Sequence, residues 1–191
     1  QAGGDWRIID KISKIQVLLN GATICKSLTG KCAQALSFYD DRVVAPDTWR
    51  NYAANVQWCY VLINFGRNLF DDQYGLDLAK YKNVQLQITN TATAASHFAD
   101  LAVSVMAFYL REAPAGFRGH LRSEEWRSWT TVADETKYHD MPTEHLLRRI
   151  ILQAIPAVDA SYVENTAMHN LMDDIDLSLD TGQVRVYKGG L

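Results

Sequence analysis

The stretch "YGLDLAKYKNVQLQITN" (residues 74–90) joins two hydrophobic periodicities and indicates the class of the fold. Its first half carries apolar residues at the spacing of one turn of helix, whereas its second half alternates apolar and polar residues strictly. The apolar positions of the second half are Val84, Leu86 and Ile88, and the polar positions are Gln85, Gln87 and Thr89. The stretch therefore predicts a short helix that leads directly into a half-buried strand.

The outer face of that strand carries neutral amides and a hydroxyl, with no charged group. Neutral amides are less heavily hydrated than charges, so a face built from them is desolvated against a neighbour at lower cost. We expect the face with Gln85 and Gln87 to pack against another element or another copy of the chain.

Two hairpins are predicted from period-two patterns that flank turn residues. "KIQVLLNGATICKSL" (14–28) alternates into and out of Asn20-Gly21, and "DDIDLSLDTGQVRVYKGG" (173–190) does the same around Asp180-Thr181-Gly182. Such turn residues between alternating segments are the strongest local signal for a hairpin.

Helices and further strands are expected between these hairpins. "GKCAQALSFYDD" (30–41) predicts a helix of two to three turns, and "VVAPDTWRNYAAN" (43–55) predicts a loop with a second short helix. Further strands are expected at 56–67, which is apolar on both faces, at 97–112, at 127–135 and at 148–155, the last after a short helix that begins at Pro142-Thr143.

This order of elements predicts an all-β fold in one domain, residues 1–191. Eight or nine strands are interrupted by short helices and long loops, and no βαβ alternation occurs. An antiparallel eight-stranded jelly-roll sandwich with short helices in the inter-strand connections fits that pattern. A closed barrel is the alternative, and the strand at 56–67, apolar on both faces, fits it less well.

Composition excludes several classes of function. The chain has 191 residues, of which 48% are hydrophobic, and its 19 basic and 22 acidic residues give a net charge of -3, which argues against direct nucleic-acid binding. The longest apolar stretches fall short of the roughly 20 residues of a membrane-spanning helix, and "QAGGDWRIID" has no basic-then-apolar leader. Three cysteines without zinc spacing (Cys25, Cys32 and Cys59) predict buried thiols in a reducing compartment.

Motifs that carry catalysis are not found in the sequence. The five histidines are scattered, and the best cluster, His139, Asp140, Glu144 and His145 in "HDMPTEH", fits a solvated loop better than a metal site. Adjacent acidic pairs such as Asp71-Asp72 predict exposed charge rather than the facing carboxylates of a glycosidase. We therefore predict no enzymatic activity and no cofactor or metal.

The strand order itself carries a resemblance. The run "KISKIQVLLNGATICKSLTG" (11–30), a helix, "WRNYAANVQWCYVLINFGR" (49–67), residues 74–90, "RRIILQAIP" (148–156) and residues 173–190 resembles a jelly-roll unit of the major capsid proteins of tailless icosahedral viruses, the double-jelly-roll lineage. The resemblance covers most of the chain and includes the small helix placed directly before the strand in "LDLAKYKNVQLQI". It is not a catalytic signature.

The resemblance implies a structural role in a virion. In that family each subunit carries two jelly rolls, three subunits form a pseudo-hexagonal capsomer, and the shell often covers an inner membrane. The implied partners are copies of this chain, other capsid proteins and a second jelly-roll half, with assembly in the host cytoplasm. The chain departs from that family in one respect. Its 191 residues are fewer than such proteins usually have, and they contain too few strands for two jelly rolls. The chain is then one half of a double roll, or a single-roll capsid or vertex protein.

Candidate contact residues follow from residue type, since aromatic and arginine side chains dominate interface energetics. Together with the amide face they are Trp49, Arg50, Tyr52, Gln85, Gln87, Trp126, Arg127 and Trp129. For each tryptophan the alternative is that it caps the core at a strand entry. A lectin-like carbohydrate-binding jelly roll, in which these tryptophans stack on a sugar, is the second hypothesis, and a metal-dependent cupin enzyme is the third.

Overall fold

The computed structural model describes residues 8–42, 58–92, 102–110, 116–132, 134–154, 172–179 and 182–190. The chain divides into two compact units, which comprise residues 3–131 and 132–191. Each unit is described by itself.

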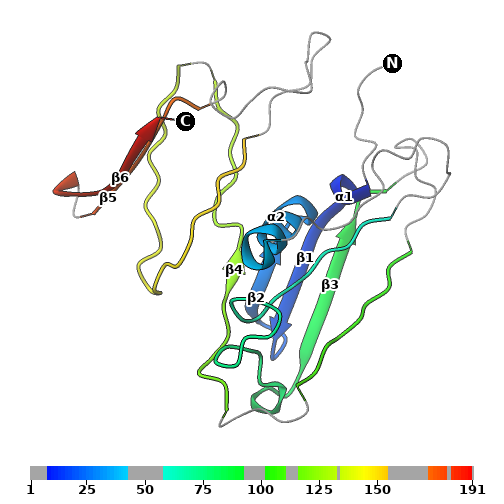
Figure 1. Ribbon diagram of the computed structural model, residues 1–191. Coiled ribbons are helices and arrows are strands. Elements are labelled where there is room, and N and C mark those ends of the chain that lie inside the picture. Colours follow the sequence, from blue (N-terminus) through cyan, green and yellow to red (C-terminus); the bar gives the residue numbers. More distant parts are fainter. Residues whose placement is uncertain are drawn as a thin grey trace. The chain divides into compact units, whose positions relative to one another are not determined.

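The first unit is built on a four-stranded mixed sheet (Figure 1). Its strands are β1 (Ile12–Leu19), β2 (Thr23–Leu28), β3 (Val84–Asn90) and β4 (Ser123–Glu124). They lie in the order β3-β1-β2-β4, so that β3 and β4 form the two edges. β1 is antiparallel to β2 and β3, whereas β2 and β4 are parallel.

The predicted hairpin at 14–28 is confirmed as β1 and β2. Asn20 and Gly21 both have positive φ angles, of 53° and 75°, which asparagine and glycine tolerate best. The register passes from Val17 opposite Lys26 to Leu18 opposite Ile24, so Cys25 is the extra residue of a β-bulge. A bulge turns neighbouring side chains to one side, and Cys25 and Lys26 are accordingly both buried.

Three helices lie near this sheet, two of them at predicted positions. α1 (Ile8–Lys11) precedes β1, α2 (Gly30–Asp41) follows β2, and the 3-10 helix η1 (Leu78–Lys80) precedes β3, as the sequence predicts for the latter two. Thr29 caps α2, because its Oγ1 accepts from the Cys32 N–H at 3.2 Å. A Cβ at Gly30 would lie 2.6 Å from the Ile9 carbonyl oxygen, so only glycine lets α2 begin this close to α1.

The core lies on one face of the sheet, under α2 and the segment 58–65 (Figure 1). Strict alternation along β1 points its odd-numbered residues inward. The buried apolar residues of the sheet are Ile15, Val17 and Leu19 of β1 and Cys25 and Leu28 of β2. Ala33 of α2, with Val61, Ile63 and Phe65, covers them.

The second unit contains an antiparallel hairpin of β5 (Asp174–Leu179) and β6 (Val184–Gly190), which confirms the prediction for 173–190. Gly182 has a φ of 91°, in the left-handed region that favours glycine. Arg185 Nε lies 3.0 Å from Asp176 Oδ2 across the two strands. None of the residues that the structure describes in this unit is buried.

The predicted strand at 56–67 is corrected. Residues 58–67 belong to no strand of the sheet and are not buried on both faces. Val61, Ile63 and Phe65 turn toward the core, whereas Trp58 and Tyr60 are exposed. The segment packs on the sheet through its side chains, so one apolar face is left outside.

Three other predicted strands are also wrong over their described residues. Within 97–112, residues 102–110 form no strand, and each of them is exposed. Neither 127–135 nor 141–154 forms the predicted strand or helix, whereas the short strand β4 lies where no strand was predicted. β-branched and apolar content makes a segment suitable for a strand, but a strand forms only where a partner edge supplies hydrogen bonds.

The regular structure of the described residues is therefore mostly strand, with six strands and three helices. The strands form a mixed sheet and a separate hairpin. They show neither a closed barrel nor the eight-stranded jelly roll. The predicted short helix at 43–55 lies outside the described residues.

Candidate functional site

The sheet face opposite the core carries neutral polar groups in cross-strand rows. The register aligns Gln87 of β3 with Gln16 of β1 and Ser27 of β2, and it aligns Gln85 with Leu18. Gln16 Nε2 donates to Ser27 Oγ at 3.4 Å, while Gln85 and Gln87 are exposed. We call the residues Gln16, Ser27, Gln85, Gln87 and Thr89 the amide face. An exposed Lys14, opposite Thr89, stands at one end of it.

The structure thus confirms that the strand has an uncharged outer face and places that strand at an edge. Backbone groups show which way β3 is bonded: Asn83 accepts from the Asn20 N–H at 2.7 Å, and the Thr91 N–H donates to the Lys11 carbonyl at 2.7 Å. The N–H and C=O groups of successive residues in a strand point to opposite sides. The odd-numbered residues of β3 therefore form their backbone hydrogen bonds with β1. The N–H and C=O groups of Val84, Leu86 and Ile88 therefore point away from the sheet. We call this the free edge of β3.

The opposite edge, β4, differs in length and charge. It has two residues, and Arg122 Nη2 lies 2.8 Å from Glu124 Oε2 there. Short strands with charged side chains are how natural sheets prevent association at their edges. β3 has seven residues, none of them charged and none proline. Of the two edges, only β3 lacks these protective features.

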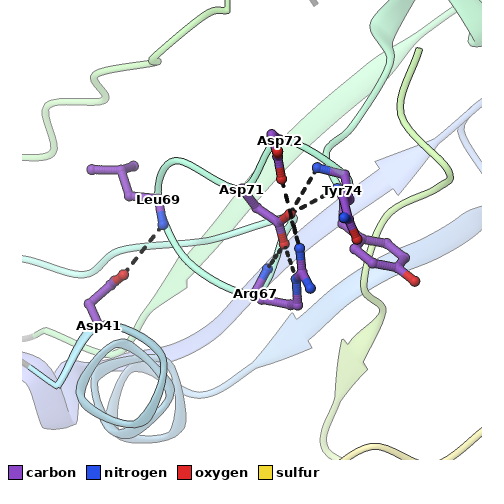
Figure 2. Close-up of polar contacts among 7 residues, drawn as sticks. Asp41, Arg67, Leu69, Asp71, Asp72 and Tyr74 are labelled. Atoms are coloured by element: carbon purple, nitrogen blue, oxygen red, sulfur yellow. Dashed lines mark hydrogen bonds and ion pairs between the residues drawn. The ribbon is translucent and has the colours of Figure 1, made fainter. Parts of the chain in front are cut away.

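A carboxylate that sequence reasoning assigned to exposed charge is buried in a loop beside the sheet. Asp71 accepts from Arg67 Nε and Nη2, each at 2.7 Å, and from the Arg67 N–H at 2.7 Å (Figure 2). It also accepts from the N–H groups of Gln73 and Tyr74, at 2.9 and 3.2 Å. Asp72 points outward, as predicted, with its side chain 76% exposed.

These contacts hold a loop rather than a reactive group. The hydrogen bonds from Arg67, followed by those from backbone N–H groups, lower the pKa of Asp71 below its usual range. The loop in turn pairs with a distant segment, since the Gly75 N–H donates to the Gly119 carbonyl at 2.9 Å. Asp71 is ionised at neutral pH, and both of its carboxylate oxygens accept hydrogen bonds from the loop. It is therefore a structural carboxylate.

The predicted contact residues do not gather at one place. Gln85 and Gln87 lie on β3, whereas Trp126, Arg127 and Trp129 follow β4, at the other edge of the same sheet. The Arg127 guanidinium lies 5.6 Å from the Trp126 ring centroid, and Trp129 is exposed. The other three predicted contact residues, Trp49, Arg50 and Tyr52, lie outside the described residues.

An exposed aromatic surface on α2 and residues 58–62 was missed from the sequence. Phe38 and Tyr39 meet edge to face with centroids 5.5 Å apart, as do Trp58 and Tyr60 at 5.3 Å. Ser37 Oγ joins the two segments, because it donates to the Leu62 carbonyl at 3.1 Å. Both faces of 58–65 are apolar, so the pattern alone cannot tell which face turns outward.

The thiol of Cys25, in β2, is buried in the core of the first unit. Burial raises the pKa of Cys25, and burial together with Lys26 lowers the pKa of His120. A thiol that stays protonated is unreactive.

Lys26 Nζ donates to Ser123 Oγ at 3.0 Å, and this hydrogen bond joins β2 to β4.

Within the described ranges no three histidine, cysteine or acidic side chains come together as a metal site. The helices of the same ranges include none that is long and apolar enough to cross a membrane. Comparison with known proteins finds no matching family model, no matching curated protein and no matching solved structure.

Proposed function

We propose that this chain is a structural capsid protein that self-assembles into capsomers of an icosahedral viral shell. The proposal includes the finer fold, in which a jelly roll of eight strands is completed beyond the four-stranded sheet and the hairpin. It also includes the partners expected from the resemblance, namely copies of this chain, other capsid proteins and a second jelly-roll half. The protein acts in the virion, after assembly in the host cytoplasm, and not as an enzyme.

The observation that carries this proposal is the large number of apolar side chains that are exposed to solvent. Every described residue between 102 and 110 is exposed, with Phe108 at 72%, although the segment is almost wholly apolar. In the second unit Tyr138 is 89% exposed and no described residue is buried. Contiguous exposed apolar surface of this kind marks protein–protein contact sites.

The second unit strengthens the argument for obligate partners. The regular structure among its described residues is one two-stranded hairpin, and an isolated hairpin is at best marginally stable in water. The hairpin leaves Leu179, Val184 and Val186 exposed. Described residues with so little burial gain stability from a surface that covers them, as subunits of a shell do.

Charge and chemistry support contact with protein. A net charge of -3 provides no basic field for phosphate, and the outer face of β3 is neutral. A coat protein requires a rigid sheet and extensive surfaces for its neighbours, but no nucleophile.

The test is the mass of the purified protein in solution, measured by light scattering after size exclusion at two salt concentrations. A trimer, a pentamer or a larger shell seen by electron microscopy is expected. Because the contacts proposed are apolar and neutral, high salt should not dissociate them. A 21.5 kDa monomer at every concentration would refute the proposal.

A carbohydrate-binding module is a second candidate, favoured by one observation. Trp129 is exposed three residues from Trp126, outside any helix or strand, and exposed tryptophans stack on sugars. Glycan screening of the wild type and of Trp129→Ala tests it, with Trp58→Ala as a control for loss of an exposed tryptophan elsewhere. Binding that only Trp129→Ala removes, in a monomeric protein, would favour this function over the capsid.

A further inference from the structure

We propose that β3 of one copy pairs antiparallel with β3 of a second copy, about a two-fold axis at Gln87, so that two four-stranded sheets join into one. This inference rests on the proposed self-assembly and names one contact by which it occurs. Its occupant is a second copy of this chain, for three reasons that concern hydrogen bonding, charge and side-chain chemistry.

The first reason is the unpaired backbone of the free edge. The outward N–H and C=O groups of Val84, Leu86 and Ile88 have no hydrogen-bond partner among the described residues. An extended strand offered to such an edge adds main-chain hydrogen bonds along its whole length. The edge also lacks charges, proline and bulges on β3, which are the features that would exclude another strand.

The second reason is the absence of self-repulsion. In a two-fold interface a residue on the axis meets its own copy, so a charge there meets a like charge, whereas a residue off the axis meets a different residue of the partner. The seven residues of β3 include no charged side chain.

The third reason is that the middle of β3 matches itself on both faces. Full overlap of the seven residues places Gln87, the middle one, opposite its copy. Because Gln87 bonds toward β1, it occupies a non-hydrogen-bonded position across the free edge, where side chains approach most closely. Each carboxamide has one acceptor and two donors, so the two can bond reciprocally. On the other face Leu86, which is exposed in the single chain, would meet Ile88 of the second copy.

The alternative occupant is residues 102–110 of the same chain. That segment is apolar on both faces, since Val103 and Val105 alternate with Met106 and Phe108. Pairing it with β3 would set bulky apolar side chains beside Gln85 and Gln87. A second β3 instead sets Gln87 opposite Gln87, Gln85 opposite Thr89 and Leu86 opposite Ile88, so polar residues continue the amide face and the observations favour the second copy.

The test uses the full chain and analytical ultracentrifugation over a range of concentrations. Gln87→Lys places two lysines opposite each other and should weaken the dimer on the order of tenfold or more. Thr23→Lys adds the same charge at an exposed position of β2, away from the free edge, and should dimerise as the wild type does. Mixing Gln87→Lys with Gln87→Glu should restore the dimer, which a folding defect would not allow.

The outcomes separate this inference from the proposed function. If Gln87→Lys assembles as the wild type does, the β3 pairing is refuted while self-assembly stands. If the wild type stops at a dimer that Gln87→Lys abolishes, the pairing stands and the capsid proposal fails; a wild-type monomer refutes both. Amide exchange of monomeric Gln87→Lys adds a check, because Leu86 and Ile88 amides that stay protected in the monomer would show that the chain covers its own edge and would overturn the proposal.

Discussion

Replacing Asp71 by asparagine tests whether one buried carboxylate holds the loop beside the sheet. The Asp71 side chain is 2% exposed and accepts from the Arg67 side chain and from three backbone N–H groups (Figure 2). Asparagine has nearly the same shape but turns an NH₂ group toward some of these donors and removes the charge. We expect Asp71→Asn to lower the free energy of unfolding at pH 7.

The size of this loss follows from the exposure of the partners. A hydrogen bond to a charged group contributes about 1.5–3 kcal/mol, but the Arg67 side chain is 44% exposed, which screens its part to about 1 kcal/mol or less. The three backbone N–H donors account for the rest of the loss. Water can replace the carboxylate as their hydrogen-bond acceptor only partly, because the loop is buried there. The sum is about 2–3 kcal/mol. Asp72→Asn, at an exposed side chain 4.0 Å from Arg67, is the matched control and should cost less than about 0.5 kcal/mol.

Urea denaturation followed by tryptophan fluorescence measures both variants, and its pH dependence gives a second check. The folded-state pKa of Asp71 lies below its ordinary value of 3.8, so its stabilisation is present above that pH and is lost as the pH falls toward the folded-state pKa. The difference between the wild type and Asp71→Asn should be constant from pH 7 to about 5 and should shrink below about pH 4.

Two results would refute the reasoning. Asp71→Asn as stable as Asp72→Asn at pH 7 would mean that the loop does not depend on the carboxylate. A difference that grew on acidification would mean that Asp71 is protonated more readily in the folded state than in the unfolded state.

Three further predictions concern the first unit. Leu19→Ala, at a buried core position, should lower the free energy of unfolding by about 2–5 kcal/mol in the same urea experiment, and a change below about 1 kcal/mol would mean that this core is not packed as described. Cys25 should react with a thiol reagent more slowly than the half-buried Cys59, as mass spectrometry of partly labelled protein would show, because its thiol is buried with a raised pKa; equal rates would contradict this. Gly75→Ala places a Cβ 2.6 Å from the Phe117 ring and should cost about 1–3 kcal/mol, so a neutral effect would show that Phe117 moves freely.

Local signals in the sequence were sufficient for the two hairpins and for α2. Asn20-Gly21 and Gly182 supply the left-handed backbone of the turns, and the period-two patterns beside them do not depend on distant residues. Thr29 at the start of α2 caps it within one turn. The same holds for the short helix before β3, where the Asp77 side chain accepts from the Ala79 N–H at 3.1 Å.

Strand pairing was not accessible in this way. Residues 102–110 and 127–135 have the composition of strands, yet their described residues find no partner edge, whereas the two residues of β4 pair with β2. The Lys26–Ser123 hydrogen bond joins residues 97 positions apart. No short-range pattern encodes a contact over that separation, since it depends on how the whole chain is folded.

For the candidate site, the sequence by itself determined that the outer face of residues 84–90 is neutral, because side-chain identity and the period of two fix the chemistry of each face. Only the tertiary structure decided that β3 lies at an edge, that its free backbone points outward from Val84, Leu86 and Ile88, and that Asp71 is buried while Asp72 is not. The physical reason is that edges and burial are relations between segments distant in sequence, while the chemistry of a face is written in the segment itself.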